Sequence, residues 1–185
     1  MEIEALLAAR LESLRRERGW SLEQLANQCG ISRATLSRIE RGELSPTAAM
    51  LGRLCTVYGW TLSRLLAAAE GEAPDLVRDE QQAAWSDPET GYSRRAVSPP
   101  GRGLQGELVV VTLPAGSSVG FEDSPSPGLE HHLWVMEGEL KVTAEAREYR
   151  LEAGDCLRYR LRGGTRFESG GGPARYLIAI VHEKR

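Results

Sequence analysis

The sequence of 185 residues has only three cysteines, far apart and without a Cys-x-x-Cys motif. This argues against a disulfide framework or a cysteine zinc site, so we expect Cys29, Cys55 and Cys156 to be small buried residues. No run of about 18 apolar residues occurs, and no transmembrane helix is expected. The N-terminus is amphipathic and begins with acidic residues, unlike a signal peptide. We therefore expect a cytoplasmic protein without a membrane partner.

Lysine is almost absent, because Lys141 and Lys184 are the only two and arginine supplies the other permanent positive charges. The net charge of -3 does not favour nucleic-acid binding by bulk electrostatics. Residues 1–70 nevertheless hold nine Arg against eight acidic residues, whereas the remainder holds 14 basic and 18 acidic residues. Any contact with DNA must therefore depend on where individual arginines lie.

Apolar residues recur at helical spacing through the first 69 residues and predict five short helices, the first reaching about Arg18. Ser21 followed by Gln24 is typical of a capping box at the start of the second helix. The expected N-caps of the second to fifth helices are Ser21, Ser32, Thr47 and Thr61. A tight turn at Gly30 between the second and third helices predicts a helix-turn-helix.

The segment from Ser32 to Arg41 carries the functional signal. Leu36 and Ile39 lie three residues apart and can face inward, which leaves a short, polar and basic outer face. An arginine on such a face can pair bidentately with guanine O6 and N7 in the major groove of DNA. Taken alone, the segment fits an ordinary solvated helix equally well.

Residues 10–66 resemble the Xre/Cro-type helix-turn-helix family. The resemblance rests on Arg15, Gly19-x-Ser21-x-x-x-Leu25-Ala26, Gly30-Ile31-Ser32, Leu36-Ser37-Arg38-Ile39-Glu40-Arg41-Gly42, Pro46-Thr47, Leu51 and Leu54. It implies that the third helix reads bases through Arg33, Ala34, Ser37 and Arg38. It also implies phosphate contacts at Ser21, Ser32, Thr35 and Arg41, and a structural pair between Glu40 and Arg15. Members of this family bind as dimers to DNA half-sites.

The second half of the chain has a different residue pattern, in which Gly and Pro interrupt short apolar segments. We interpret residues 70–84 as a linker. Beyond it, strands are expected at residues 104–113, on both sides of Glu137-Gly138 within residues 133–142, and at residues 148–151, 157–161 and 176–181. Many short strands at this spacing predict a small β-sandwich or barrel. A loop over the barrel mouth is expected at residues 120–128.

Residues 104–182 resemble a cupin, a jelly-roll β-barrel. The matching pieces are Leu113-Pro114-Ala115-Gly116, Val135-Met136-Glu137-Gly138-Glu139-Leu140, Tyr149-x-Leu151-x-Ala153-Gly154-Asp155, Arg166-Phe167 and Pro173-Ala174-Arg175-Tyr176-Leu177. The two resemblances imply an α+β protein of two domains, a five-helix helix-turn-helix bundle (1–69) and a cupin-like effector and dimerisation domain (85–185). Such chains resemble a class of bacterial transcription regulators.

Cupins that bind a metal ion use two His, one Glu and a further His, and these positions fall here on Pro125, Pro127, His131 and Thr165. Because three of the four positions cannot ligate or ligate weakly, we predict no metal, no cofactor and no catalytic residue. His131 and His132 are adjacent in a strand and point to opposite faces. The barrel is instead expected to hold a small-molecule effector on His131, Leu133, Val135, Thr165 and Phe167.

The leading hypothesis is a transcription regulator that binds a double-stranded DNA operator as a homodimer and senses a small molecule through its cupin domain, without enzymatic activity. The exposed face of Trp134 is a candidate dimer anchor. For Arg158, Arg160 and Arg162, a solvated sheet face is favoured over contact with an anionic ligand. Two alternatives stay open, a metal-dependent cupin enzyme with a DNA-binding head and a cupin that serves only as a dimerisation block.

Overall fold

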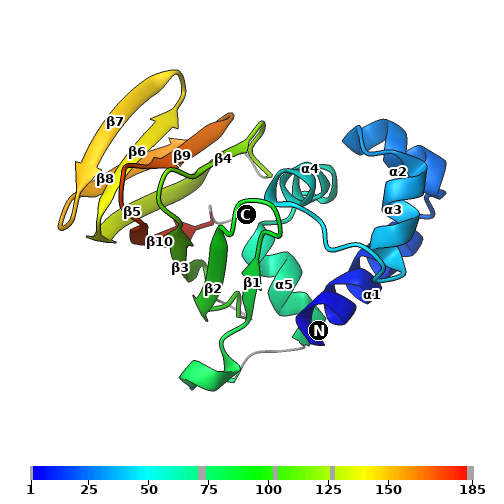
Figure 1. The fold of residues 1–185 in the computed structure, drawn as a ribbon. Coiled ribbons are helices and arrows are strands. Elements are labelled where there is room, and N and C mark those ends of the chain that lie inside the picture. Colours follow the sequence, from blue (N-terminus) through cyan, green and yellow to red (C-terminus); the bar gives the residue numbers. More distant parts are fainter. Residues whose placement is uncertain (1, 71–73, 102–103, 126–127, 183–185) are drawn as a thin grey trace.

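The computed structural model describes residues 2–70, 74–101, 104–125 and 128–182, so residues 71–73 of the predicted linker lie outside the described residues. Helices occupy the first part of the chain and antiparallel strands the second (Figure 1). This is the predicted α+β class, with a helical bundle and a jelly-roll barrel.

The five predicted helices are present. They are α1 (Glu2–Glu17), α2 (Leu22–Cys29), α3 (Arg33–Glu40), α4 (Ala48–Tyr58) and α5 (Leu62–Glu70). The predicted capping box of α2 forms, because the Gln24 amide donates to Ser21 Oγ over 3.1 Å and the Ser21 amide donates to Gln24 Oε1 over 2.8 Å. Gly30 ends α2 with a φ of 65°, a left-handed conformation that favours glycine. No helix of the described ranges has the length and apolar character needed to cross a membrane.

The helical bundle is organised around buried leucines. Leu7, Leu11 and Leu14 of α1 are at most 4% exposed. Helix α3 buries Leu36 and Ile39, as its sequence predicts, and turns its other faces outward. The bundle therefore fixes which side of α3 is free to meet a partner.

The second part of the chain forms two antiparallel sheets. The strands are β1 (Ala84–Ser86), β2 (Ser93–Ser98), β3 (Gly106–Leu113), β4 (Ser118–Phe121), β5 (Leu129–Glu137), β6 (Glu139–Ala144), β7 (Arg147–Glu152), β8 (Cys156–Leu161), β9 (Thr165–Ser169) and β10 (Ala174–Val181), after a short 3-10 helix, η1 (Asp79–Gln81). One sheet has the order β1-β2-β3-β10-β5-β8 and the other β4-β9-β6-β7. Two such sheets around an apolar interior form the jelly roll of a cupin.

The prediction of a loop over residues 120–128 is wrong for its first two residues. Gly120 and Phe121 belong to β4, which pairs with β9 from Ser118 opposite Glu168 to Phe121 opposite Thr165. This short strand was missed because its partner lies more than 40 residues further along the chain. Residues 126–127 of the predicted loop lie outside the described residues.

The helical bundle and the barrel pack directly against each other. In Figure 1, α4 and α5 lie between the strands and α1–α3. The buried Asp87 carboxylate, just after β1, accepts a hydrogen bond from the Ala48 amide at the start of α4. The Thr61 hydroxyl, just before α5, donates to the buried Glu107 carboxylate of β3 over 3.1 Å. One apolar cluster continues through both parts, so α4 and α5 are held by the barrel as well as by the bundle.

Candidate functional site

The exposed face of α3 contains two arginines without a protein partner. Arg33 and Arg38 are exposed, and neither forms a hydrogen bond or ion pair with a described residue. Ala34 is exposed between them. A helix end with free guanidinium groups and no bulky apolar side chain is chemically suited to the major groove of DNA.

The predicted phosphate-contacting residues around α3 are engaged within the protein. Ser32 Oγ accepts a hydrogen bond from the Thr35 amide over 3.1 Å and lies 2.8 Å from the Thr35 hydroxyl. Arg41 donates to both carboxylate oxygens of Glu43, over 2.7 and 2.9 Å, and also contacts Ser37 Oγ. These residues are near the surface, so they can reach a phosphate, but Arg41 must first leave Glu43.

A buried ion pair holds α3 against α1. Arg15 donates to the two carboxylate oxygens of Glu40 over 2.8 and 2.7 Å, and the side chains are only 13% and 8% exposed. The pair predicted between these residues is therefore present. Its hydrogen bonds raise the pKa of Arg15, so the guanidinium stays charged. The bidentate geometry fixes the orientation of α3 relative to the bundle.

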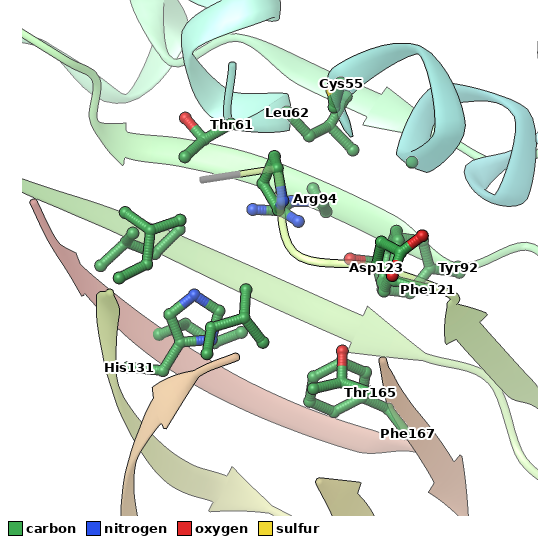
Figure 2. Close-up of a pocket in the computed structure, with 16 residues that line it drawn as sticks. Cys55, Thr61, Leu62, Tyr92, Arg94, Phe121, Asp123, His131, Thr165 and Phe167 are labelled. Atoms are coloured by element: carbon green, nitrogen blue, oxygen red, sulfur yellow. The ribbon is translucent and has the colours of Figure 1, made fainter. Parts of the chain in front are cut away.

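A second candidate site is a cavity of about 60 Å³ between the helical bundle and the barrel (Figure 2). The helices contribute Gly52, Cys55, Thr61 and Leu62 to its wall. The barrel contributes, among others, Tyr92, Arg94, Phe121, His131, Thr165 and Phe167. Because both parts of the chain form the wall, an occupant would contact both.

Three of the five predicted effector-binding residues line this cavity. They are His131, Thr165 and Phe167, whereas Leu133 and Val135 are fully buried in the barrel core and do not line it. His131 Nδ1 lies 3.1 Å from the Tyr159 hydroxyl. Burial, followed by the nearby Arg94, lowers the pKa of His131 to about 4. The imidazole is therefore neutral at pH 7.

Sequence reasoning missed Arg94 of β2, the positively charged group in the cavity wall. Its side chain is only 9% exposed, and its Nη2 donates to Ser63 Oγ on α5 over 3.2 Å. Burial opposes its charge, but the neighbouring Tyr92, Tyr176 and Glu107 outweigh this effect and raise the pKa of Arg94. The only available signal was the alternation of Tyr92, Arg94 and Ala96, and an arginine in such a pattern is normally read as facing solvent.

The positions that carry the metal ligands in metal-binding cupins do not form a ligand set where the structure describes them. In the described part of the chain, no three His, Cys, Asp or Glu side chains gather so that they could hold a metal ion. His131, Thr165 and Pro125 line the cavity, and Pro127 lies outside the described residues. His132 is on the same strand as His131 but does not line the cavity. Its partners in the neighbouring strands are Arg158 and Ala179.

Known proteins resemble this chain in its helical part and over most of its length. Residues 6–68 match the family model of a helix-turn-helix domain. The chain is 27% identical to the HTH-type transcriptional regulator SutR of Escherichia coli (strain K12), over 97% of this chain and 96% of SutR. It is 29% identical to the HTH-type transcriptional regulator PuuR of the same organism, over 78% of this chain and 77% of PuuR.

The crystal structure of an HTH_3 family transcriptional regulator from Vibrio cholerae has the same fold, with a TM-score of 0.80 and 22% identity over the full length of both chains. The likeness therefore extends through the barrel as well as the helical bundle. Residues 6–68 therefore form a helix-turn-helix domain, a barrel of the cupin fold follows it, and nearly the whole chain is similar to an HTH-type transcriptional regulator.

Proposed function

We propose that the protein regulates transcription by sequence-specific binding to a double-stranded DNA operator, with α3 in the major groove. The observation that carries this proposal is the exposed face of α3, where Arg33 and Arg38 form no hydrogen bond or ion pair with a described residue. The Arg15–Glu40 ion pair supports it, because it holds the helix in one orientation. Arg33, Ala34, Ser37 and Arg38 face the bases, and Ser21, Ser32, Thr35 and Arg41 face the phosphates.

We also propose that the barrel joins two chains through the outer face of its six-stranded sheet. Four side chains lie in register across neighbouring strands on this face, namely Val110, Leu177, Trp134 and Cys156. Cys156 is exposed here, so the prediction of its burial was wrong, whereas Cys29 and Cys55 are buried. Trp134 is 47% exposed, which is unusual for a side chain of this size. A second copy that covers this apolar row would bury the indole, and tryptophan is enriched among residues that dominate binding energy.

The cavity between the bundle and the barrel supports a third part of the proposal, the sensing of a small molecule. Its walls are largely apolar and include a few polar groups, as in many ligand sites. Occupancy can change DNA affinity only through a difference in ligand affinity between two states of the protein. The enzyme alternative is tested by metal analysis of the purified protein, and stoichiometric iron, manganese or zinc that is lost in His131→Gln would favour it.

Selection of bound sequences from a pool of random DNA tests the regulator proposal. We expect enrichment of two inverted half-sites whose centres lie about one helical turn, or a multiple of it, apart. The double variant Arg33→Ala/Arg38→Ala should not enrich the same sequence. Failure of the intact protein to enrich any sequence would contradict DNA reading, and enrichment of a single half-site would contradict the dimer.

A further inference from the structure

Arg94 is a buried cation without an acidic partner. It forms no ion pair with a described residue, and its Nε has no hydrogen-bond partner there. Glu107 lies near enough to affect it electrostatically, but the Glu107 carboxylate accepts from Thr61 and contacts His182. A buried charge that lacks a paired opposite charge destabilises the folded protein. The described residues therefore leave the positive charge of Arg94 uncompensated by a paired anion.

Figure 2 shows where an opposite charge could enter. Arg94 lies in the cavity between Thr61 and Leu62 of the helical side and His131 of the barrel. His131 is neutral at pH 7 because burial lowers its pKa to about 4, so it does not compete as a second cation. The site therefore offers one permanent positive charge, which a guanidinium presents in a planar geometry that fits a carboxylate bidentately.

The rest of the wall limits the size and charge of the occupant. Leu62, Phe121 and Phe167 are apolar and would contact a hydrocarbon tail. The exposed Asp123 also lines the cavity, so a second negative charge on the ligand, beyond the one paired with Arg94, would meet a carboxylate that repels it. A volume of about 60 Å³ exceeds the roughly 10–15 Å³ that one water needs, but it restricts a ligand to a few heavy atoms.

We propose that this cavity binds a small aliphatic monocarboxylate, whose carboxylate pairs with Arg94 and whose tail packs between the helical bundle and the barrel. The inference rests on the proposed sensing function and names the ligand class. Arg94 already donates to Ser63 on α5, so the ligand would share an anchor with the last helix of the helix-turn-helix bundle. The occupant would therefore bridge the two parts of the chain.

The test uses the full chain and three sodium salts, acetate, butyrate and hexanoate, at constant ionic strength. Binding is measured by isothermal titration calorimetry and compared with the corresponding neutral amides. We expect saturable binding of at least one salt, and binding of its amide weaker by about tenfold or more, because charge-assisted hydrogen bonds to Arg94 are lost. Equal affinity for salt and amide, or no saturable binding of any salt, would overturn the proposal without any variant.

Variants assign the binding to Arg94. Arg94→Gln should weaken the carboxylate by about tenfold or more, and its circular dichroism spectrum shows whether it folds. Arg95→Gln, its neighbour on the same strand and outside the cavity wall, is the matched control and should bind as the unmodified chain does. If Arg94→Gln does not fold, the comparison of salt and amide in the unmodified chain still decides the proposal. Unchanged binding in the folded Arg94→Gln variant would overturn the proposal.

Measuring DNA binding with the same samples distinguishes failure of the proposed ligand class from failure of the proposed regulatory function. If the chain binds its selected operator but no carboxylate, only the proposed ligand class is contradicted. Binding of the neutral amide as tightly as the salt would keep a sensing role and remove the anionic anchor. A chain that binds carboxylate but enriches no DNA would instead contradict the proposed regulator.

Discussion

Arg15, Arg38 and Arg94 carry the same guanidinium in three different surroundings. Arg15 is buried against Glu40 and orients a helix. Among the described residues, Arg38 is exposed without an ion pair and Arg94 is buried without one. Because arginine cannot lose its charge in a protein, these two groups stay cationic, and we propose a nucleic acid as the partner of Arg38 and a small anion as the partner of Arg94.

Replacement of Arg38 by alanine should weaken binding to the selected operator by about 1–3 kcal/mol and relax specificity at one base pair. The reason is the loss of a bidentate contact with a guanine edge. Fluorescence anisotropy at one fixed salt concentration measures the effect on operator and random DNA. Arg16→Ala on α1, an exposed arginine paired with Glu12, is the control and should change neither affinity. Equal weakening on both DNAs would restrict Arg38 to phosphate contact.

His131 should make stability depend on pH. Its pKa is about 4 in the folded chain, against an ordinary value of 6.5, so the unfolded chain binds more protons between these values and stability falls as the pH falls. Between pH 7 and pH 5 this contributes a loss of about 1–2 kcal/mol. Urea denaturation across this range should show a smaller loss in His131→Gln than in the unmodified chain. Parallel curves for the chain and His131→Gln would contradict the burial of an uncharged imidazole.

At the scale of elements, the helices were predictable because their end signals are local in the sequence. Ser21 and Gln24 form the capping box of α2, and Ser32 caps α3 from the position just before it. In both helices the capping residue and the amide that it caps are close together in the sequence. The strand β4 was not predictable from local pattern, since it has four residues and its pairing with β9 is distant. Arg94 was missed for a related reason, because its inward orientation depends on helix α5, with which β2 has no local connection.

The turn between β5 and β6 depends on glycine at position 138. Its φ is +79°, and an added Cβ would lie 2.1 Å from the Pro173 carbonyl oxygen. Gly138→Ala should therefore lower the free energy of unfolding by about 2–4 kcal/mol, from the left-handed conformation and the clash together. Gly116→Ala is the matched control, because its φ is +64° with no atom within 4 Å, and it should cost only about 1–2 kcal/mol. Equal losses in urea denaturation would contradict a role for the Pro173 contact.

At the scale of the whole molecule, the sequence predicts two parts with separate roles, and the structure joins them through buried polar contacts. Thr61 and Glu107 are 46 residues apart, and Ser63 and Arg94 are 31 residues apart. Such contacts leave no periodic signal in the sequence. For this reason the predicted effector site lay inside the barrel alone, whereas the cavity has helices α4 and α5 in its wall.

The central claim is that the barrel presents two reading helices to one operator. The most direct test measures the affinity of the intact protein for DNA with one or two copies of the selected half-site, beside Trp134→Glu and a control variant, Leu104→Glu. Leu104 is 68% exposed but lies outside the apolar row of Trp134. Light scattering gives the oligomeric state of each sample.

We expect the protein and Leu104→Glu to be dimers and to bind two half-sites about 10²–10⁴ times more tightly than one. Trp134→Glu should be a monomer that loses this gain and keeps the affinity for a single half-site. A dimer that binds one and two half-sites with equal affinity would contradict the claim, as would a monomeric Trp134→Glu variant that retains the full gain.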